Sequence, residues 1–174
     1  IADSNNQPRV LDTIIVSNGK FQFEGSALEP EINFISMEGV QGNVPFVIEP
    51  GKIKAKLYKD DLNSSEFIGT SSNDSYALYK NETKSLINSL NEIVKEINRA
   101  NALGDNLLVE DLQEQYRDIQ KEIKDYEIEF IRNHIDSFIS ALILEKFLTS
   151  KQIDVKEARN YYNNLNDQIR NSKT

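Results

Sequence analysis

The sequence predicts an α+β protein, in which an amino-terminal antiparallel β-sheet or small β-sandwich is followed by four helices that include a long antiparallel hairpin. All four prolines and six of the seven glycines precede residue 70, whereas Glu, Lys, Asn and Leu dominate afterwards. Apolar residues alternate with period two in the first part and recur every three or four residues in the second. We therefore divide the chain into a β domain, 1–73, and a helical domain, 74–174.

The first expected element is a β-hairpin around Ser17-Asn18-Gly19-Lys20. Asn-Gly accepts the positive φ angles of a type I′ turn, which two-residue hairpin loops prefer. This register places four apolar side chains on one face, which another part of the protein must cover. They are Ile14, Val16, Phe21 and Phe23.

Further strands are expected after the hairpin, at 32–37, 44–49, 52–58 and 67–69. In the third of these, lysines alternate with Ile53, Ala55 and Leu57, so that one face is buried and the other is a row of lysines in water. The polar run 70–73 can cap the first helix. With the hairpin, the sheet would contain about five or six strands.

Two long amphipathic helices are expected next, at about 74–100 and 109–133. In the first, Leu86, Leu90, Ile93 and Ile97 share one face, which Ile87 and Val94 widen. In the second, apolar residues alternate at steps of four and three. They are Leu112, Tyr116, Ile119, Ile123, Tyr126 and Phe130. The two helices should form an antiparallel hairpin, because Gly104 in the turn 101–108 suits a left-handed cap.

Two shorter helices complete the prediction. The segment 137–148 is apolar nearly all round, so it should be the most buried element. The last helix opens with Asp154 and Glu157 at the spacing of a capping box and presents one apolar face. That face comprises Ala158, Tyr161, Tyr162, Leu165 and Ile169.

Composition excludes several classes of function. The chain has no cysteine, which rules out disulfides, thiolate zinc sites and a thiol nucleophile within it. Its one histidine, His134, excludes a His-rich metal site. Twenty basic against 28 acidic residues give a net charge of −8, which disfavours nucleic acid as a partner. The apolar runs fall short of the roughly 18 residues of a membrane span. We predict no cofactor, no metal and no catalytic residue.

Three features resemble functional motifs, and each has a structural explanation. Residues 61–66 place oxygen side chains at alternate positions, as a calcium loop does, but they lack its central glycine and distal glutamate, so a polar hairpin loop fits better. His134 follows the second long helix, whose dipole favours it there. Four lysines along the third strand either block edge pairing or attract an anionic surface. They are Lys52, Lys54, Lys56 and Lys59.

The acidic residues of the second long helix are expected to form a solvated face rather than an acid–base pair, because basic residues interleave with them. They are Glu122, Asp125, Glu127 and Glu129. A binding surface is expected instead on the exposed loops 39–43 and 60–65, since loops on a rigid scaffold most often carry recognition.

Several segments resemble a known family. Residues 11–25, 46–52 and 67–73 are similar to stretches of a domain of unknown function found at the amino end of many bacterial thioredoxin-like proteins. Residues 133–141 resemble the helical linker that follows it, through Asn133, Asp136 and Ser137. In such proteins a lipoprotein or secretory signal comes first, and a TlpA-like thioredoxin domain with Trp-Cys-x-x-Cys comes last.

The resemblance implies that the parent is a thiol-disulfide oxidoreductase in the periplasm or cell envelope of a Gram-negative bacterium, tied to a membrane only through a removed anchor or signal. Our first hypothesis is a non-catalytic amino-terminal module that positions the carboxy-terminal thioredoxin-like domain or binds a partner protein. The alternative is a self-standing envelope binding module with no redox domain. The second long helix could also serve as an oligomerisation seam, but we expect a monomer because the other helices can fill that seam.

Overall fold

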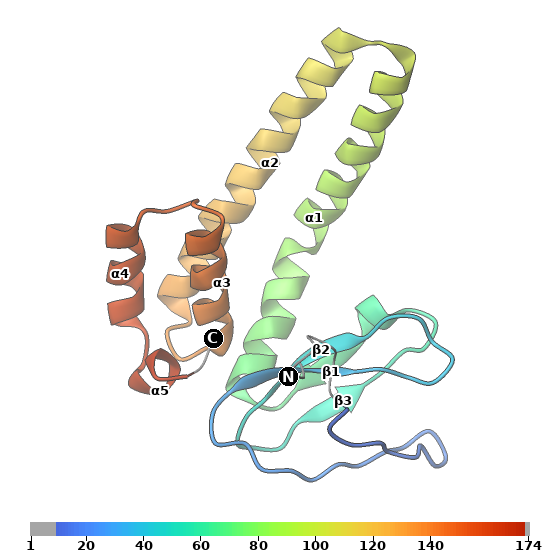
Figure 1. Cartoon of the computed structure of the whole chain (residues 1–174), viewed down its shortest axis with the longest axis vertical. Helices are drawn as coiled ribbons and strands as arrows, with labels where there is room; N and C mark the ends of the chain where they lie inside the picture. Colours follow the sequence, from blue (N-terminus) through green and yellow to red (C-terminus); the bar gives the residue numbers. More distant parts are fainter. Residues whose placement is uncertain (1–9, 173–174) are drawn as a thin grey trace.

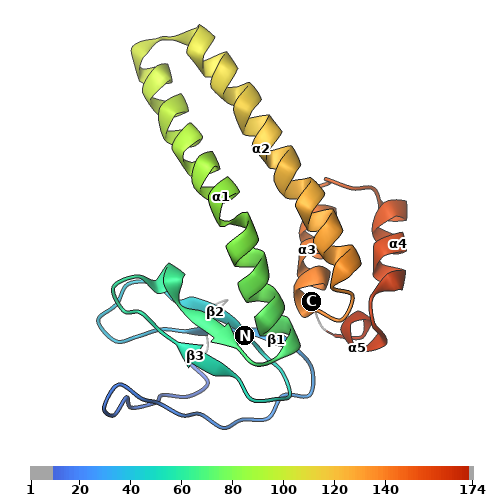
Figure 2. The same cartoon turned by 180° about the vertical axis from the view of Figure 1, so that it is seen from behind.

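The computed structural model of the chain describes residues 10–172 and confirms the α+β class. These residues contain four strands, which are β1 (Glu31–Ile35), β2 (Val44–Ile48), β3 (Lys54–Lys56) and β4 (Glu66–Ile68), and one 3-10 turn, η1 (Leu62–Ser64). Five helices follow, which are α1 (Ser71–Leu103), α2 (Asn106–Asn133), α3 (Phe138–Thr149), α4 (Val155–Asn164) and α5 (Asp167–Arg170). Helices α1 and α2 project from the β part as a long hairpin, and α3 to α5 lie beside the base of α2 (Figures 1 and 2).

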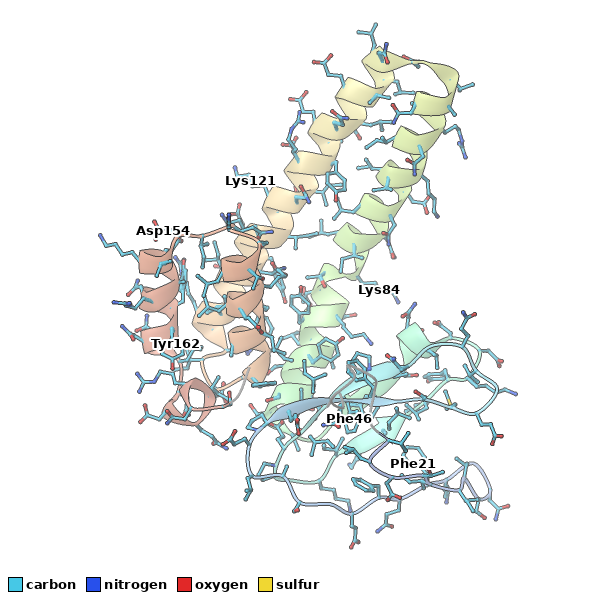
Figure 3. All side chains as sticks on the ribbon, viewed as in Figure 1. Phe21, Phe46, Lys84, Lys121, Asp154 and Tyr162 are labelled. Carbon is cyan, nitrogen blue, oxygen red and sulfur yellow. The ribbon has the colours of Figure 1, made fainter. Side chains whose placement is uncertain are left out.

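The strands form two separate antiparallel pairs, β1 with β2 and β3 with β4. The pairs meet through Phe46 and Phe67, whose rings stack with their centroids 4.7 Å apart; Figure 3 shows Phe46 inside the β part. The alternation predicted for the third strand is confirmed, because its lysines are exposed and Ala55 is half-buried. The expectation of five or six strands was wrong, since residues 10–172 contain four.

The missing strands are those of the first hairpin, of which only the turn is confirmed. Asn18 and Gly19 have φ angles of 52° and 70°, and Ser17 and Lys20 exchange two backbone hydrogen bonds of 2.9 and 3.0 Å. Within the described residues the pairing stops at this bridge. The apolar face expected to be covered is largely exposed at Ile14, Val16 and Phe23. Asn-Gly fixes a turn, but a two-stranded ribbon needs a third strand or a packed face to persist.

The α1–α2 hairpin confirms the predicted turn chemistry. Gly104 ends α1 in the left-handed region, at φ 72°, and the side chain of Asp105 begins α2 by accepting a hydrogen bond from the backbone N–H of Leu108. Ile93 and Leu112 are buried in the seam between the two helices. The predicted widening of the α1 face was wrong, because Ile87 and Val94 are exposed. The narrow apolar stripe of α2 covers only one side of that face.

Helix α3 is the most buried element, as predicted. Ser137 caps it, and six of its twelve residues are buried. Phe147, with 0% of its surface exposed, lies in a core that α2, α3, α4 and α5 share with Val47 of β2. The β part and the helical part therefore contribute to one hydrophobic cluster.

The predicted fourth helix is divided in two. The Asp154 half of the capping box is confirmed, because its carboxylate accepts the backbone N–H of Glu157 at 2.7 Å; the Glu157 carboxylate accepts the Tyr161 hydroxyl at 3.4 Å. Leu165 then leaves the helical conformation, and the side chain of Asn166 caps α5 by accepting the N–H of Gln168. The predicted face was correct for its other members, which are buried, but wrong for Tyr162, which is exposed. The Asn166 cap favours a new helix over continuation of the old one.

A buried polar joint connects β2 to the first turn of α1. The side-chain amide of Asn73 accepts the N–H of Val47 at 3.0 Å and donates to its carbonyl at 2.7 Å. The Glu49 carboxylate accepts both the backbone N–H and the hydroxyl of Ser72, each at 2.8 Å. A carboxylate at a helix N-terminus is favourable because it pairs with free N–H groups and the positive end of the dipole. The prediction that the run 70–73 caps this helix was wrong: Thr70, the N-cap residue, makes no side-chain cap hydrogen bond, and Glu49, which directly follows β2, supplies the acceptor instead.

The prediction of a fully solvated acidic face on α2 was wrong for Glu127, which is 1% exposed. Its carboxylate accepts hydrogen bonds of 2.5 Å from the hydroxyl of Tyr79 on α1 and from the ammonium of Lys146 on α3. Burial, together with the Glu127 carboxylate, raises the pKa of the Tyr79 hydroxyl. The burial of Glu127 could not be predicted from the pattern of α2 alone, because it arises where α3 packs against α2. The other three acidic residues are exposed.

Candidate binding surface

The two loops that the sequence marked as candidate binding segments lie side by side in the structure. One connects β1 to β2 and the other connects β3 to β4, and together they surround a hollow of about 410 Å³. Its walls are formed by Val40, Gln41, Gly42, Asn43, Lys59, Asp60, Asp61, Leu62 and Asn63. The walls carry amide, carboxylate and ammonium groups, which can bind a peptide or another polar ligand through hydrogen bonds.

The first loop is shaped by two glycines in conformations that other residues rarely adopt. Gly39, at φ 75°, is the third residue of a turn in which the N–H of Val40 donates to the carbonyl of Met37 at 3.1 Å. Gly42, at φ 106°, faces the second loop, and a Cβ atom at this position would lie 3.2 Å from a methyl group of Leu62. Glycine therefore allows the two loops to approach closely here.

The second loop is held by its own side chains and by helix α1. The Ser64 hydroxyl donates to the Asp61 carboxylate at 2.5 Å, which lowers the pKa of that carboxyl group. The Lys80 ammonium of α1 donates to the carbonyls of Asn63 and Ser65 at 3.1 and 3.2 Å. Burial lowers the pKa of Lys80. The Lys80 ammonium thus binds two backbone carbonyls of the segment that resembled a calcium loop. This contact favours the interpretation of the segment as a polar loop.

Two of the remaining sequence candidates, His134 and Lys56, have structural partners. His134 ends α2, where its N–H donates to the Phe130 carbonyl at 2.9 Å and its ring lies 4.3 Å from the Phe130 ring. Lys56 stands opposite Glu66 across the β3–β4 pair and lies over the ring of Tyr58. Within residues 10–172 no cluster of three or more His, Cys, Asp or Glu side chains could hold a metal ion. In the same range no helix is long and apolar enough to cross a membrane.

A second hollow, of about 350 Å³, lies at the junction of the β part with α1 and α5. Its polar lining includes Glu49, Ser71, Asp136 and Asn166, and the Ser71 hydroxyl donates to the Asp136 carboxylate at 3.3 Å. The Glu49 carboxylate is already bonded to Ser72. We therefore interpret this hollow as part of the joint between the β part and the helices.

Replacing Lys80 with Met should loosen the second loop while leaving the fold intact. The substitution removes two hydrogen bonds from a charged donor, and because Lys80 is partly exposed the global stability should fall by only about 1 kcal/mol. Hydrogen exchange measured by mass spectrometry should show faster exchange of the segment 59–65. Lys121→Met, which changes an exposed lysine on α2, is the matched control; equal exchange in the two variants would contradict the anchoring role.

Both candidate loops lie within a segment of the chain that matches a known family. Residues 1–76 match the family described as Domain of unknown function (DUF4369). The matched segment includes all four described strands, both loops and the first turn of α1. No curated protein and no solved structure matched the chain. The family match agrees with the amino-terminal part of the resemblance carried by residues 11–25, 46–52 and 67–73.

Proposed function

We propose that the chain is a non-catalytic module that holds a protein partner, and that it forms the amino-terminal part of a cell-envelope thiol-disulfide oxidoreductase. The observation that carries the binding role is the meeting of the two loops 39–43 and 60–65, which supply most of the residues around one polar hollow. Loops on a rigid scaffold are the usual place for recognition. The redox role of the parent is supported by the resemblance of 11–25 and 133–141 to the amino-terminal and linker segments of thioredoxin-like proteins.

The rigidity of the scaffold supports this proposal. Lys80 ties the second loop to α1, and the Asn73 side chain ties β2 to the same helix. Val47 of β2 also packs into the helical core. Loops held in this way lose little conformational freedom when a partner binds, which favours affinity.

Because the sequence has no cysteine, this proposal assigns the redox chemistry to another domain of the parent protein and not to this chain. Thiol-disulfide exchange requires a thiolate that attacks a disulfide sulfur and forms a mixed disulfide. A thioredoxin-like domain elsewhere in the parent would perform that attack, and this module would position it or hold its substrate. Helix α5 shares the second hollow with Gly51 and Gly69 of the β part, so a domain that follows α5 would start close to the strands.

The test has two measurements. The 174-residue chain should not accelerate the reduction of insulin by dithiothreitol above the rate without protein, and turnover by the chain would contradict a non-catalytic role. The parent reading frame should encode Trp-Cys-x-x-Cys after residue 174. A frame that stops soon after that residue would contradict the redox part of the proposal and leave a self-standing envelope binding module.

A further inference from the structure

The far end of the α1–α2 hairpin carries exposed apolar side chains. Leu103 and Leu107 are 79% and 81% exposed, and Leu108 beside them is 44% exposed. We call these three residues the leucine tip. The left-handed Gly104 and the Asp105 cap fix the turn between them, and the tip lies at the end of the projecting hairpin, away from the strands (Figures 1 and 2).

The hairpin does not need the leucine tip for its own packing. Ile93, Ala100 and Leu112 form the buried cluster between the two helices near this end, and Ile97 and Val109 pack against that cluster. Apolar side chains that are exposed together on a fixed projection commonly mark a site of interaction with another molecule.

The surroundings of the leucine tip are acidic. Residues 92–114 hold six acidic and two basic side chains, so this segment has a net charge of −4, which is half of the −8 carried by the whole chain. One of the two basic residues, Lys95, is already paired with Glu92 at 2.6 Å. The acidic residues are Glu92, Glu96, Asp105, Glu110, Asp111 and Glu114.

We propose that the leucine tip docks into a partner protein that presents an apolar groove edged by lysine or arginine. The leucines would supply the buried centre of the contact, and the acidic residues around them would face the basic rim. This inference rests on the partner-holding part of the proposed function and adds a second surface at the opposite end of the molecule from the loops.

The negative charge around the leucine tip argues against two other binding partners, an anionic membrane and a second copy of the chain. An anionic membrane surface attracts basic segments, so it would repel this one. A second copy of the chain would bring two acidic ends together, which is also unfavourable. An apolar groove with a basic rim is the partner surface that complements both the exposed leucines and the acidic residues around them.

The test uses a fluorescent synthetic helical peptide whose leucine face is flanked along both edges by lysines, with a matched peptide in which glutamate replaces lysine. Fluorescence anisotropy with the full 174-residue chain should show binding at least about tenfold tighter for the lysine peptide. The double variant Leu103→Ser/Leu107→Ser should weaken that binding by about tenfold or more. Both leucines are exposed, so circular dichroism should show an unchanged fold.

Two further variants separate the contribution of the leucines at the tip from that of the acidic residues around them. Leu28→Ser removes a still more exposed leucine, 97% exposed and located before β1, and should leave binding unchanged. Glu110→Lys/Asp111→Lys should reduce the preference for the lysine peptide, and added salt should do the same.

Equal binding of both peptides, or full binding by the leucine double variant, would overturn the proposal. Co-sedimentation with phosphatidylcholine or phosphatidylglycerol vesicles that depends on the two leucines would assign the tip to a membrane instead. These outcomes are independent of the insulin assay and of the reading frame, so failure at the tip is distinguishable from failure of the proposed function.

Discussion

Phe147→Ala should lower the free energy of unfolding by about 3–5 kcal/mol. The ring is completely buried in the core that joins α2, α3, α4, α5 and β2. Its removal loses the favourable burial of an aromatic side chain and leaves a cavity that packed neighbours fill only in part. Urea denaturation followed by far-ultraviolet circular dichroism measures the change.

The neighbouring residue provides the control. Leu148 is in the same helix but 41% exposed, so Leu148→Ala should cost no more than about 1–1.5 kcal/mol. Equal losses in the two variants would show that the helical core does not close around Phe147 as described.

Asn73→Ala should lower the free energy of unfolding by about 2–4 kcal/mol. The side chain pairs both backbone groups of Val47 and also donates to the Thr70 hydroxyl at 2.8 Å. Alanine would leave the N–H and the carbonyl of Val47 buried without these bonds, and each unpaired group costs about 1–3 kcal/mol. Hydrogen exchange of the Val47 amide should accelerate along with the loss of global stability.

Two other substitutions isolate the cause of that loss. Asn81→Ala changes an exposed asparagine in the same helix and should stay within about 0.5 kcal/mol of the wild type. Asn73→Asp keeps an acceptor for the Val47 N–H but faces the Val47 carbonyl with a second acceptor, so it should also be destabilising. Wild-type stability in Asn73→Asp would contradict the two-sided pairing.

The sequence predicted best where local chemistry decides the structure. Asn18-Gly19 requires positive φ angles, Gly104 suits a left-handed helix end, and Asp154 caps a helix from its own side chain; the structure confirms all three. Predictions failed where packing between distant segments decides. Ile87 lies at the same helical spacing as the seam residues, but its side chain is 42% exposed.

The candidate surface was predictable only in part. Loop composition marked 39–43 and 60–65, but their contact depends on how the two strand pairs stack through Phe46 and Phe67. The anchoring role of Lys80 and the burial of Glu127 were not predicted, because their partners lie 15 to 17 and 19 to 48 residues away in sequence. Short sequence motifs do not reveal contacts between residues that lie so far apart in the chain.

Helix α1 connects the two proposed binding surfaces mechanically. It has 33 residues, so at 1.5 Å per residue it is a rod about 50 Å long. Its first turns are fastened to β2 by Asn73 and to the second loop by Lys80, and its last turn carries Leu103. A small tilt imposed at the strand end would therefore be amplified into a much larger displacement at the other end, as in a lever.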